Sequence, residues 1–299
     1  MSSSKTLTLL DGGMGRQLSR MGAPFRLPEW SALALIEAPE YVLRAHRAFV
    51  ESGADVVTTN SYGLVPHMIG DDRFLSVGAL LADRAGNLAR EAARTRVGRP
   101  AIVAGSLPPT TPSYRPNLFE AQRATTILEV LVSGLAPYVD LWLIETQSSI
   151  AEALTALTVA KSTPLPAWVS FTLRDETGRT EPAQLRSGES VEAAVQAVFD
   201  AGARAVLFNC SQPEVMGAAV GAASRFAPEA KVGVYANAFV PEPAGDEPYA
   251  GISELRADLT PERYLAFANE WIELGATIIG GCCGIGPEHI AALRDGLRS

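Results

Sequence analysis

Short apolar runs recur along the chain, and longer stretches with helical spacing of apolar residues separate them. Most of the short runs are continuously hydrophobic, which is typical of parallel strands that are covered on both faces. The stretches between them, such as PEYVLRAHRAFVES and PERYLAFANEWIEL, place apolar residues along one side of a helix. The pattern predicts eight strands separated by helical sequence: residues 7–11, 55–60, 101–106, 141–145, 167–172, 205–210, 232–237 and 276–281.

Eight strand–helix units predict an α/β fold, a single (β/α)8 TIM barrel. A doubly wound open sheet is the competing architecture, because it uses the same alternation of strands and helices. The length of 299 residues and the count of eight strands favour the barrel. We therefore expect one domain over residues 1–299, with one large core.

The composition favours a small-molecule partner over a nucleic acid or a membrane. The formal net charge is −8, and the basic residues are scattered, so no basic patch is offered to nucleic acid or to an anionic membrane surface. No apolar run approaches the roughly 20 residues of a membrane span, and MSSSKTLTLLDGG lacks the features of a secretory signal. We expect a cytoplasmic protein, and the oligomeric state stays open.

Polar residues end the apolar strands, where the active sites of such barrels lie. Entry into a turn explains Ser106 or Thr172 taken singly. It does not explain why all three cysteines of the chain fall at these positions. The predicted ends are Asp11, Asn60, Ser106, Glu145, Thr172, Asn209 with Cys210, Asn237, and Cys282 with Cys283.

The three cysteines predict a metal site. In a closed barrel the sixth strand lies two strands from the eighth, so Cys210 is within reach of Cys282 and Cys283. Three thiolates suit zinc, which keeps an open fourth position when it is catalytic. A disulfide between the adjacent cysteines is strained and disfavoured in the cytosol. Three unrelated buried thiols are the remaining alternative.

Four motifs together resemble the homocysteine S-methyltransferase family, which includes betaine-dependent and S-methylmethionine-dependent enzymes and the homocysteine module of methionine synthase. They are LLDGGMG, LIET, FNCS and GGCCG, which occur in this order and span nearly the whole chain. The resemblance implies a zinc (β/α)8 barrel whose ligands are Cys210, Cys282 and Cys283.

The resemblance also implies a binding site for homocysteine. Asp11 and Glu145 match the acidic residues that hold its amino group, and the backbone amides of Gly12 and Gly13 match a turn that faces its carboxylate. Asp11 alone would equally fit a turn before two glycines. The further matches are Asn209, beside the first zinc ligand, and Tyr62, a tyrosine that approaches the metal when homocysteine is absent or contacts the donor.

The implied function is transfer of a methyl group from a small donor to the thiolate of L-homocysteine, giving methionine. S-methylmethionine or S-adenosylmethionine is the favoured donor, because SFTLRD resembles stand-alone sulfonium-using enzymes. The glycine after Cys283 instead resembles betaine-using relatives. Betaine, another donor, or a selenol acceptor are therefore alternatives, as is a zinc- or thiol-binding barrel without turnover. A metal-free aldolase or lyase would need a lysine at a strand end, and the predicted ends have none.

Two loops and the histidines complete the predictions. The prolines of segment 105–119 stiffen a loop that either shapes the donor pocket around Tyr114 and Arg115 or is a rigid connector. Segment 237–258 is too long for a simple barrel connection, which favours a lid or a donor-contacting flap. We expect packing or surface roles, without catalysis, for the three histidines His46, His67 and His289.

Overall fold

The computed structural model describes residues 7–176, 182–240 and 253–298. Their eight strands are parallel and form one sheet in the order β1-β8-β7-β6-β5-β4-β3-β2. An isolated parallel bridge between Leu10 and Val56 joins the first strand to the second and closes the sheet. The predicted (β/α)8 TIM barrel is therefore confirmed, and the closure excludes a doubly wound open sheet.

Each strand falls on one of the predicted apolar runs. The first and last strands are shorter than predicted, because the ends of these runs enter the turns that carry Asp11 and Cys282. The fourth is longer, and its pairing shifts register between Ile144 and Gln147. The strands are β1 (Thr8–Leu9), β2 (Val56–Thr58), β3 (Ile102–Leu107), β4 (Leu141–Gln147), β5 (Ala167–Phe171), β6 (Ala205–Asn209), β7 (Val232–Tyr235) and β8 (Ile278–Ile279).

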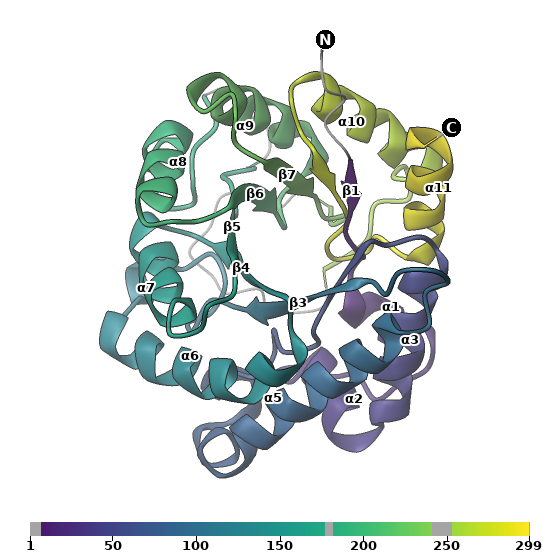
Figure 1. Ribbon diagram of the computed structural model, residues 1–299, viewed down its shortest axis with the longest axis vertical. Helices are drawn as coiled ribbons and strands as arrows, with labels where there is room; N and C mark the ends of the chain where they lie inside the picture. Colours follow the sequence, from purple (N-terminus) through teal and green to yellow (C-terminus); the bar gives the residue numbers. More distant parts are fainter. Residues whose placement is uncertain (1–6, 177–181, 241–252, 299) are drawn as a thin grey trace.

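Helices form a ring outside the strands (Figure 1). Several begin at a proline in the first turn, where the missing N–H costs nothing, and Ser149, Ser190 and Thr260 cap α7, α8 and α10 with their side chains. The helices are α1 (Met14–Arg20), α2 (Ser31–Glu37), α3 (Pro39–Glu51), α4 (Pro66–Ile69), α5 (Asp71–Ala93), α6 (Ala121–Leu135), α7 (Ile150–Ala160), α8 (Val191–Asp200), α9 (Pro213–Phe226), α10 (Pro261–Glu273) and α11 (Pro287–Leu297), with short 3-10 turns η1 (Pro116–Leu118) and η2 (Ala136–Tyr138).

Two apolar clusters stabilise the barrel. The larger lies between the strands and the helices, and the smaller fills the interior of the barrel. Residues that point inward alternate with residues that point outward along each strand, as barrel geometry requires. Cys282 packs against the inner cluster, so the filled interior ends beneath the cysteine turn. The inner cluster consists of Leu10, Val56, Ala104, Leu141, Leu143, Trp168, Ala205, Leu207, Tyr235 and Ile278.

The histidines have the packing and surface positions that the sequence predicted. His46 is fully buried in α3, and His67 is exposed on α4. His289, at the start of α11, accepts from the amide of Gly286 through Nδ1 at 3.2 Å, and its Nε2 lies 3.0 Å from the carbonyl oxygen of Leu259. Within the described ranges, no helix combines the length and apolarity of a membrane crossing.

The stems of segment 237–258 lie beside each other, because Phe239 and Leu255 form an antiparallel bridge. The middle of the segment, residues 241–252, lies outside the described residues. A lid or flap at this position stays a prediction.

Candidate metal and amino-acid site

The three cysteines meet at the carboxyl-end rim of the barrel. Their Sγ atoms all lie within 4.8 Å of one another, and Cys210 is buried while Cys282 and Cys283 are half-buried. Cys210 follows β6 directly, and the paired cysteines follow β8. The pair is tied to the end of β7, since the Cys282 amide donates to Ala236 at 2.9 Å and the Ala238 amide donates to the Cys283 carbonyl at 2.8 Å.

The donor set and its spacing fit zinc. Tetrahedral zinc with Zn–S bonds of about 2.3 Å places neighbouring sulfurs about 3.8 Å apart, a spacing compatible with the observed cluster. Cys282 and Cys283 hydrogen-bond to the Cys210 sulfur, which lowers the pKa of Cys210 well below that of an ordinary thiol and raises the pKa of its two partners. Three soft sulfur donors leave one tetrahedral position for a further ligand. The prediction that the three cysteines form one zinc site is confirmed by this cluster of three sulfur donors.

The glycine turn after Asp11 packs directly against the cysteine turn. A Cβ on Gly13 would lie 2.4 Å from the carbonyl oxygen of Cys282, and one on Gly12 would lie 2.3 Å from that of Ile285. Side chains at these positions would therefore push the two turns apart. The Gly13 amide donates to the Ile285 carbonyl at 2.9 Å. This amide is engaged within the protein, and contact of the two glycines with a substrate carboxylate stays a prediction.

Two buried carboxyl groups lie at the same rim. Asp11 accepts from the amide of Thr58 at 2.7 Å and from its hydroxyl at 3.0 Å. Glu145, within β4, accepts from the hydroxyl of Ser106, and a second carboxylate oxygen lies 3.5 Å from the hydroxyl of Tyr235. These contacts fix both carboxyl groups, so their positions are set before any ligand arrives.

Burial controls the charge of both groups. Desolvation raises the pKa of Asp11 to about 7, against the hydrogen bonds from Thr58 that lower it. The pKa of Glu145 is likewise raised to about 7, mainly by desolvation and also by the negative charges of Asp11 and Cys210. A cationic group that enters between such carboxylates favours their charged forms. The rim is therefore suited to an ammonium group.

Asn209 braces the strand ends. Its amide oxygen accepts from the amide of Thr146 at 3.0 Å and from the hydroxyl of Ser170 at 2.7 Å, and its amide nitrogen donates to the Thr146 hydroxyl at 2.8 Å. Thr146 and Cys210 both have left-handed backbones, with φ of 59° and 51°. Such conformations persist only when their surroundings hold them. Asn209, which directly precedes Cys210, thus positions Thr146, the residue that follows Glu145.

The loop after β3 reaches the first cysteine. Tyr114 donates from its hydroxyl to Cys210, at 3.1 Å from Sγ and 3.2 Å from the carbonyl oxygen. The guanidinium of Arg186 lies 4.5 Å from the centre of the Tyr114 ring and pairs with Asp175 at 2.7 Å. Arg115, the other residue predicted to shape a pocket here, donates to Asn117 at 3.4 Å within its own loop.

Tyr62 hydrogen-bonds to the same loop. Its hydroxyl lies 2.6 Å from that of Ser113. Burial raises the pKa of Tyr62 well above its ordinary value, and the negative charges of Cys210 and Glu145 contribute in the same direction. Tyr62 therefore stays a neutral phenol near the thiol cluster.

Sequence reasoning missed three side chains at this rim: Thr58, Tyr235 and Arg16. Thr58 lies inside the run DVVTTN, and Tyr235 lies inside VGVYAN, so both read as ordinary strand residues. Arg16 follows the DGG motif, but its electrostatic contact is with Cys283, more than 260 positions further along the chain. A search for polar residues just before each strand end would have found the first two.

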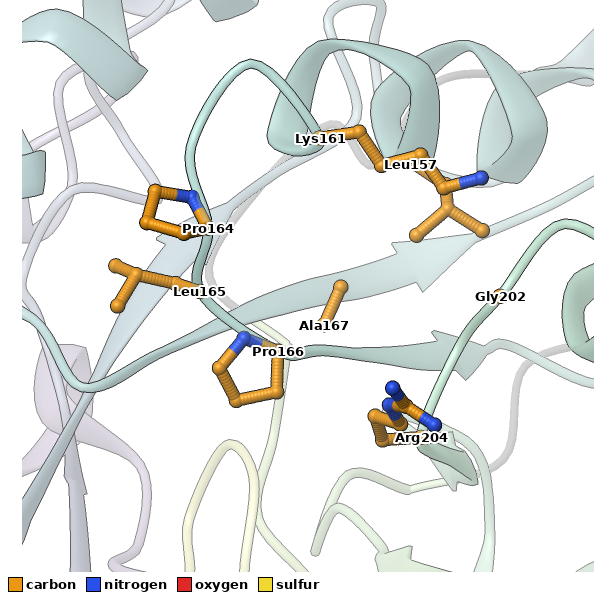
Figure 2. A pocket seen from close by; sticks show the side chains of 8 residues that line it. All are labelled: Leu157, Lys161, Pro164, Leu165, Pro166, Ala167, Gly202 and Arg204. Carbon is orange, nitrogen blue, oxygen red and sulfur yellow. The ribbon is translucent and has the colours of Figure 1, made fainter.

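A separate pocket of about 290 Å³ lies at the opposite end of the barrel. It is lined by the start of β5 at Ala167, by Arg204 just before β6, and by Lys161 after α7 (Figure 2). These are the amino ends of strands whose carboxyl ends carry the site. The pocket therefore has no part in the thiol and carboxylate arrangement.

Known proteins are similar to this chain in both sequence and fold. Homocysteine S-methyltransferase 1 of Brassica oleracea var. italica is 29% identical over 324 residues, covering 97% of this chain and 93% of the relative. Selenocysteine methyltransferase of Astragalus bisulcatus is 25% identical over 329 residues, covering 97% and 92%. The metallated crystal structure of the homocysteine methyltransferase MmuM from Escherichia coli superposes with a TM-score of 0.78 at 24% identity, covering 99% of this chain and 97% of that one.

The family resemblance extends over almost every described element. The model of the family described as homocysteine S-methyltransferase matches residues 8–297. This range contains the carboxylate turn after β1 and the cysteine turn after β8, so the matched region includes the whole candidate site. The chain belongs to the homocysteine S-methyltransferase family of enzymes.

Proposed function

We propose that this enzyme transfers a methyl group from a sulfonium donor, S-methylmethionine or S-adenosylmethionine, to the thiolate of L-homocysteine, giving methionine. The observation that supports this most is the position of two buried carboxyl groups and three clustered thiols on one rim. Homocysteine carries a thiol and an ammonium group, which match these two features. We further propose that residues 1–299 act as one homocysteine-binding domain in the cytoplasm, where a reducing environment keeps the cysteines as thiols.

Cys210, Cys282 and Cys283 would hold the zinc ion. Zinc bound there would supply a fourth position at which a substrate thiol loses its proton and stays nucleophilic at neutral pH. A free thiol with a pKa near 8.5 is mostly protonated at that pH.

Asp11 and Glu145 would bind the ammonium group of homocysteine. Both carboxyl groups are held by hydrogen bonds from the protein, so they orient the amino acid without having to reorganise. The ammonium compensates the buried negative charge, and this favours the ionised carboxylates. Asn209 would act by keeping the strand ends in place, because its polar atoms are engaged by Thr146 and Ser170.

The reaction moves one methyl group between two sulfur atoms. The homocysteine thiolate attacks the methyl carbon of the donor in line, and the bond between that carbon and the donor sulfur breaks with its electron pair left on the donor. The sulfonium donor becomes a neutral thioether, and homocysteine becomes methionine. The protein contributes mainly by holding the two reactants in contact.

A selenol acceptor is a second candidate. It is supported by the similarity to selenocysteine methyltransferase over 97% of this chain. Selenium is larger and softer than sulfur and suits a thiolate-rich metal centre equally well. Betaine or another methylated donor is a further variant of the same reaction.

Metal analysis followed by a donor panel tests the proposal. We expect about one zinc per chain and methionine formation from homocysteine with sulfonium donors. The panel should include betaine as a second donor and selenohomocysteine as a second acceptor. A protein without zinc, whose thiols stay open to alkylation in the presence of zinc and homocysteine, would refute the metal site. Zinc without methionine from any donor would indicate a binding protein without turnover.

A further inference from the structure

Arg186 lies beside the carboxyl end of β5, on the rim that carries the cysteines. The chain leaves β5 at Phe171 and returns to the same place, because Leu173 and Leu185 form an antiparallel bridge. The Arg186 amide then donates to the carbonyl of Thr172 at 3.3 Å. The backbone of Arg186 is therefore held at the end of the strand.

An ion pair fixes the Arg186 side chain against the turn that follows β6. Its guanidinium pairs with Asp175 at 2.7 Å, and only 14% and 12% of the two side chains are exposed. The other carboxylate oxygen of Asp175 accepts from the amide of Gln212 at 3.0 Å. Gln212 lies two positions after Cys210, so Asp175 ties the guanidinium to the turn that carries this cysteine. The carboxylate also offsets the guanidinium charge, which leaves little net charge to act directly on the thiols.

Arg186 reaches the first cysteine through Tyr114. The guanidinium carbon lies 4.5 Å from the centre of the Tyr114 ring, within the usual range for a cation on an aromatic face. Tyr114 belongs to the loop after β3, in no helix or strand, and its backbone is left-handed with φ of 68°. This conformation is unfavourable for a residue with a side chain and persists only when its surroundings hold it. The guanidinium on the ring face is part of that support.

The Tyr114 hydroxyl donates to two acceptors of Cys210. It lies 3.1 Å from the Cys210 sulfur and 3.2 Å from the carbonyl oxygen. Three thiolates bring three negative charges to a zinc ion with two positive charges, so a loaded site of this composition carries excess negative charge. A hydrogen bond to one sulfur spreads part of that charge. A cation on the ring face draws electron density from the ring, and this makes the hydroxyl a stronger donor.

We propose that Arg186 is a positioning residue of the zinc site, which holds the Tyr114 hydroxyl on the Cys210 sulfur. The inference rests on the proposed function, because it requires that Cys210 bind zinc. The effect reaches the metal ligand through the hydroxyl, since the guanidinium charge is already paired with Asp175. Loss of Arg186 and loss of the hydroxyl should therefore have one shared effect instead of two separate ones.

A double-mutant cycle on zinc affinity tests this. Competition with a chromophoric chelator measures the affinity of the wild-type protein, Arg186→Met, Tyr114→Phe and the variant that carries both substitutions. Each single substitution should weaken zinc binding about tenfold or more, the usual effect of losing a group that orients a metal ligand. The double variant should lie within about threefold of the weaker single variant, because both substitutions remove the same hydrogen bond. Arg186→Lys, which keeps a cation, should recover part of the loss.

Arg174→Met is the matched control. It removes a charge from the same loop after β5, where Arg174 pairs with Glu176 at 3.0 Å, and it should leave zinc affinity within about twofold. The cobalt-substituted protein supplies a second measurement. Its thiolate absorption bands should shift alike in Arg186→Met and Tyr114→Phe and stay unchanged in Arg174→Met. Urea unfolding of each variant shows whether the fold is retained.

Additive losses of zinc affinity in the double variant would overturn the inference, because they would make Arg186 a direct counter-charge of the thiols. An affinity of Arg186→Met equal to that of the wild-type protein would also overturn it, as would an Arg186→Lys variant that binds zinc no better than Arg186→Met. A wild-type protein that binds no zinc would instead refute the metal site of the proposed function.

Discussion

Glu145→Gln should stabilise the folded protein and at the same time weaken homocysteine binding. Glutamine keeps the size of the side chain and an oxygen that accepts from Ser106, and its amide group can donate to the oxygen of Tyr235. The substitution removes the buried negative charge and leaves the three cysteines unchanged. The two effects have opposite directions, so general damage to the fold cannot produce both.

The size of the stabilisation follows from the pKa. Burial raises the pKa of Glu145 from 4.5 to about 7. The folded protein therefore holds this proton more tightly than the unfolded chain, and stability falls as the pH rises from about 4.5 to 7. At about 1.4 kcal/mol for each pKa unit, the loss above pH 7 is on the order of 3 kcal/mol. Glu145→Gln avoids this loss, so its advantage should be large at pH 8 and small at pH 5.

The loss of binding has a separate origin. A charge-assisted hydrogen bond from the ammonium of homocysteine to a carboxylate contributes about 1.5–3 kcal/mol, which corresponds to roughly 10- to 150-fold in affinity. Urea unfolding at pH 5 and pH 8 measures the stability, and titration calorimetry measures the affinity for homocysteine. Zinc analysis measures the metal content. Glu152→Gln is a matched control, because burial also raises the pKa of Glu152 to about 7, but this group accepts from the Ser148 amide at the start of α7.

Two outcomes would refute this reasoning. Unchanged affinity for homocysteine would remove Glu145 from the ammonium site. A variant that is less stable than the wild-type protein at pH 8 would show that the buried charge is better compensated than its surroundings indicate.

Three further predictions concern other residues. Cys283→Ala should lose zinc and activity together, because two thiolates and an alanine no longer complete the site; a full zinc content by metal analysis would contradict this. Tyr114→Phe removes the hydroxyl that donates to the Cys210 sulfur at 3.1 Å, so the thiolate absorption bands of the cobalt-substituted protein should shift, and an unchanged spectrum would exclude this hydrogen bond. Burial lowers the pKa of His46 from 6.5 to about 4. As the pH falls, the unfolded chain therefore protonates this residue before the folded protein does. Stability should therefore drop by up to about 3 kcal/mol between pH 6.5 and 4, and urea unfolding of His46→Leu should show a shallower dependence on pH, whereas an identical dependence would contradict this.

The sequence by itself determined the barrel and the set of three cysteines that cluster at its rim. Eight continuous apolar runs predict parallel strands, and the helical spacing between them supplies the outer layer. Cys210, Cys282 and Cys283 could be assigned to one site because each falls at a strand end, and a closed barrel brings all such ends to one rim. These inferences depend on regular periodicity, which a single sequence displays.

The tertiary structure alone decided the contacts that come from irregular segments. Tyr114 reaches Cys210 across 96 positions of the chain, from a loop residue with a left-handed backbone of φ 68°. Asn209 engages Thr146 and Ser170 on two other strands, and the glycine turn after β1 packs on the cysteine turn after β8. No periodic pattern encodes these meetings. They depend on how turns of unequal length pack once the ring of strands has closed.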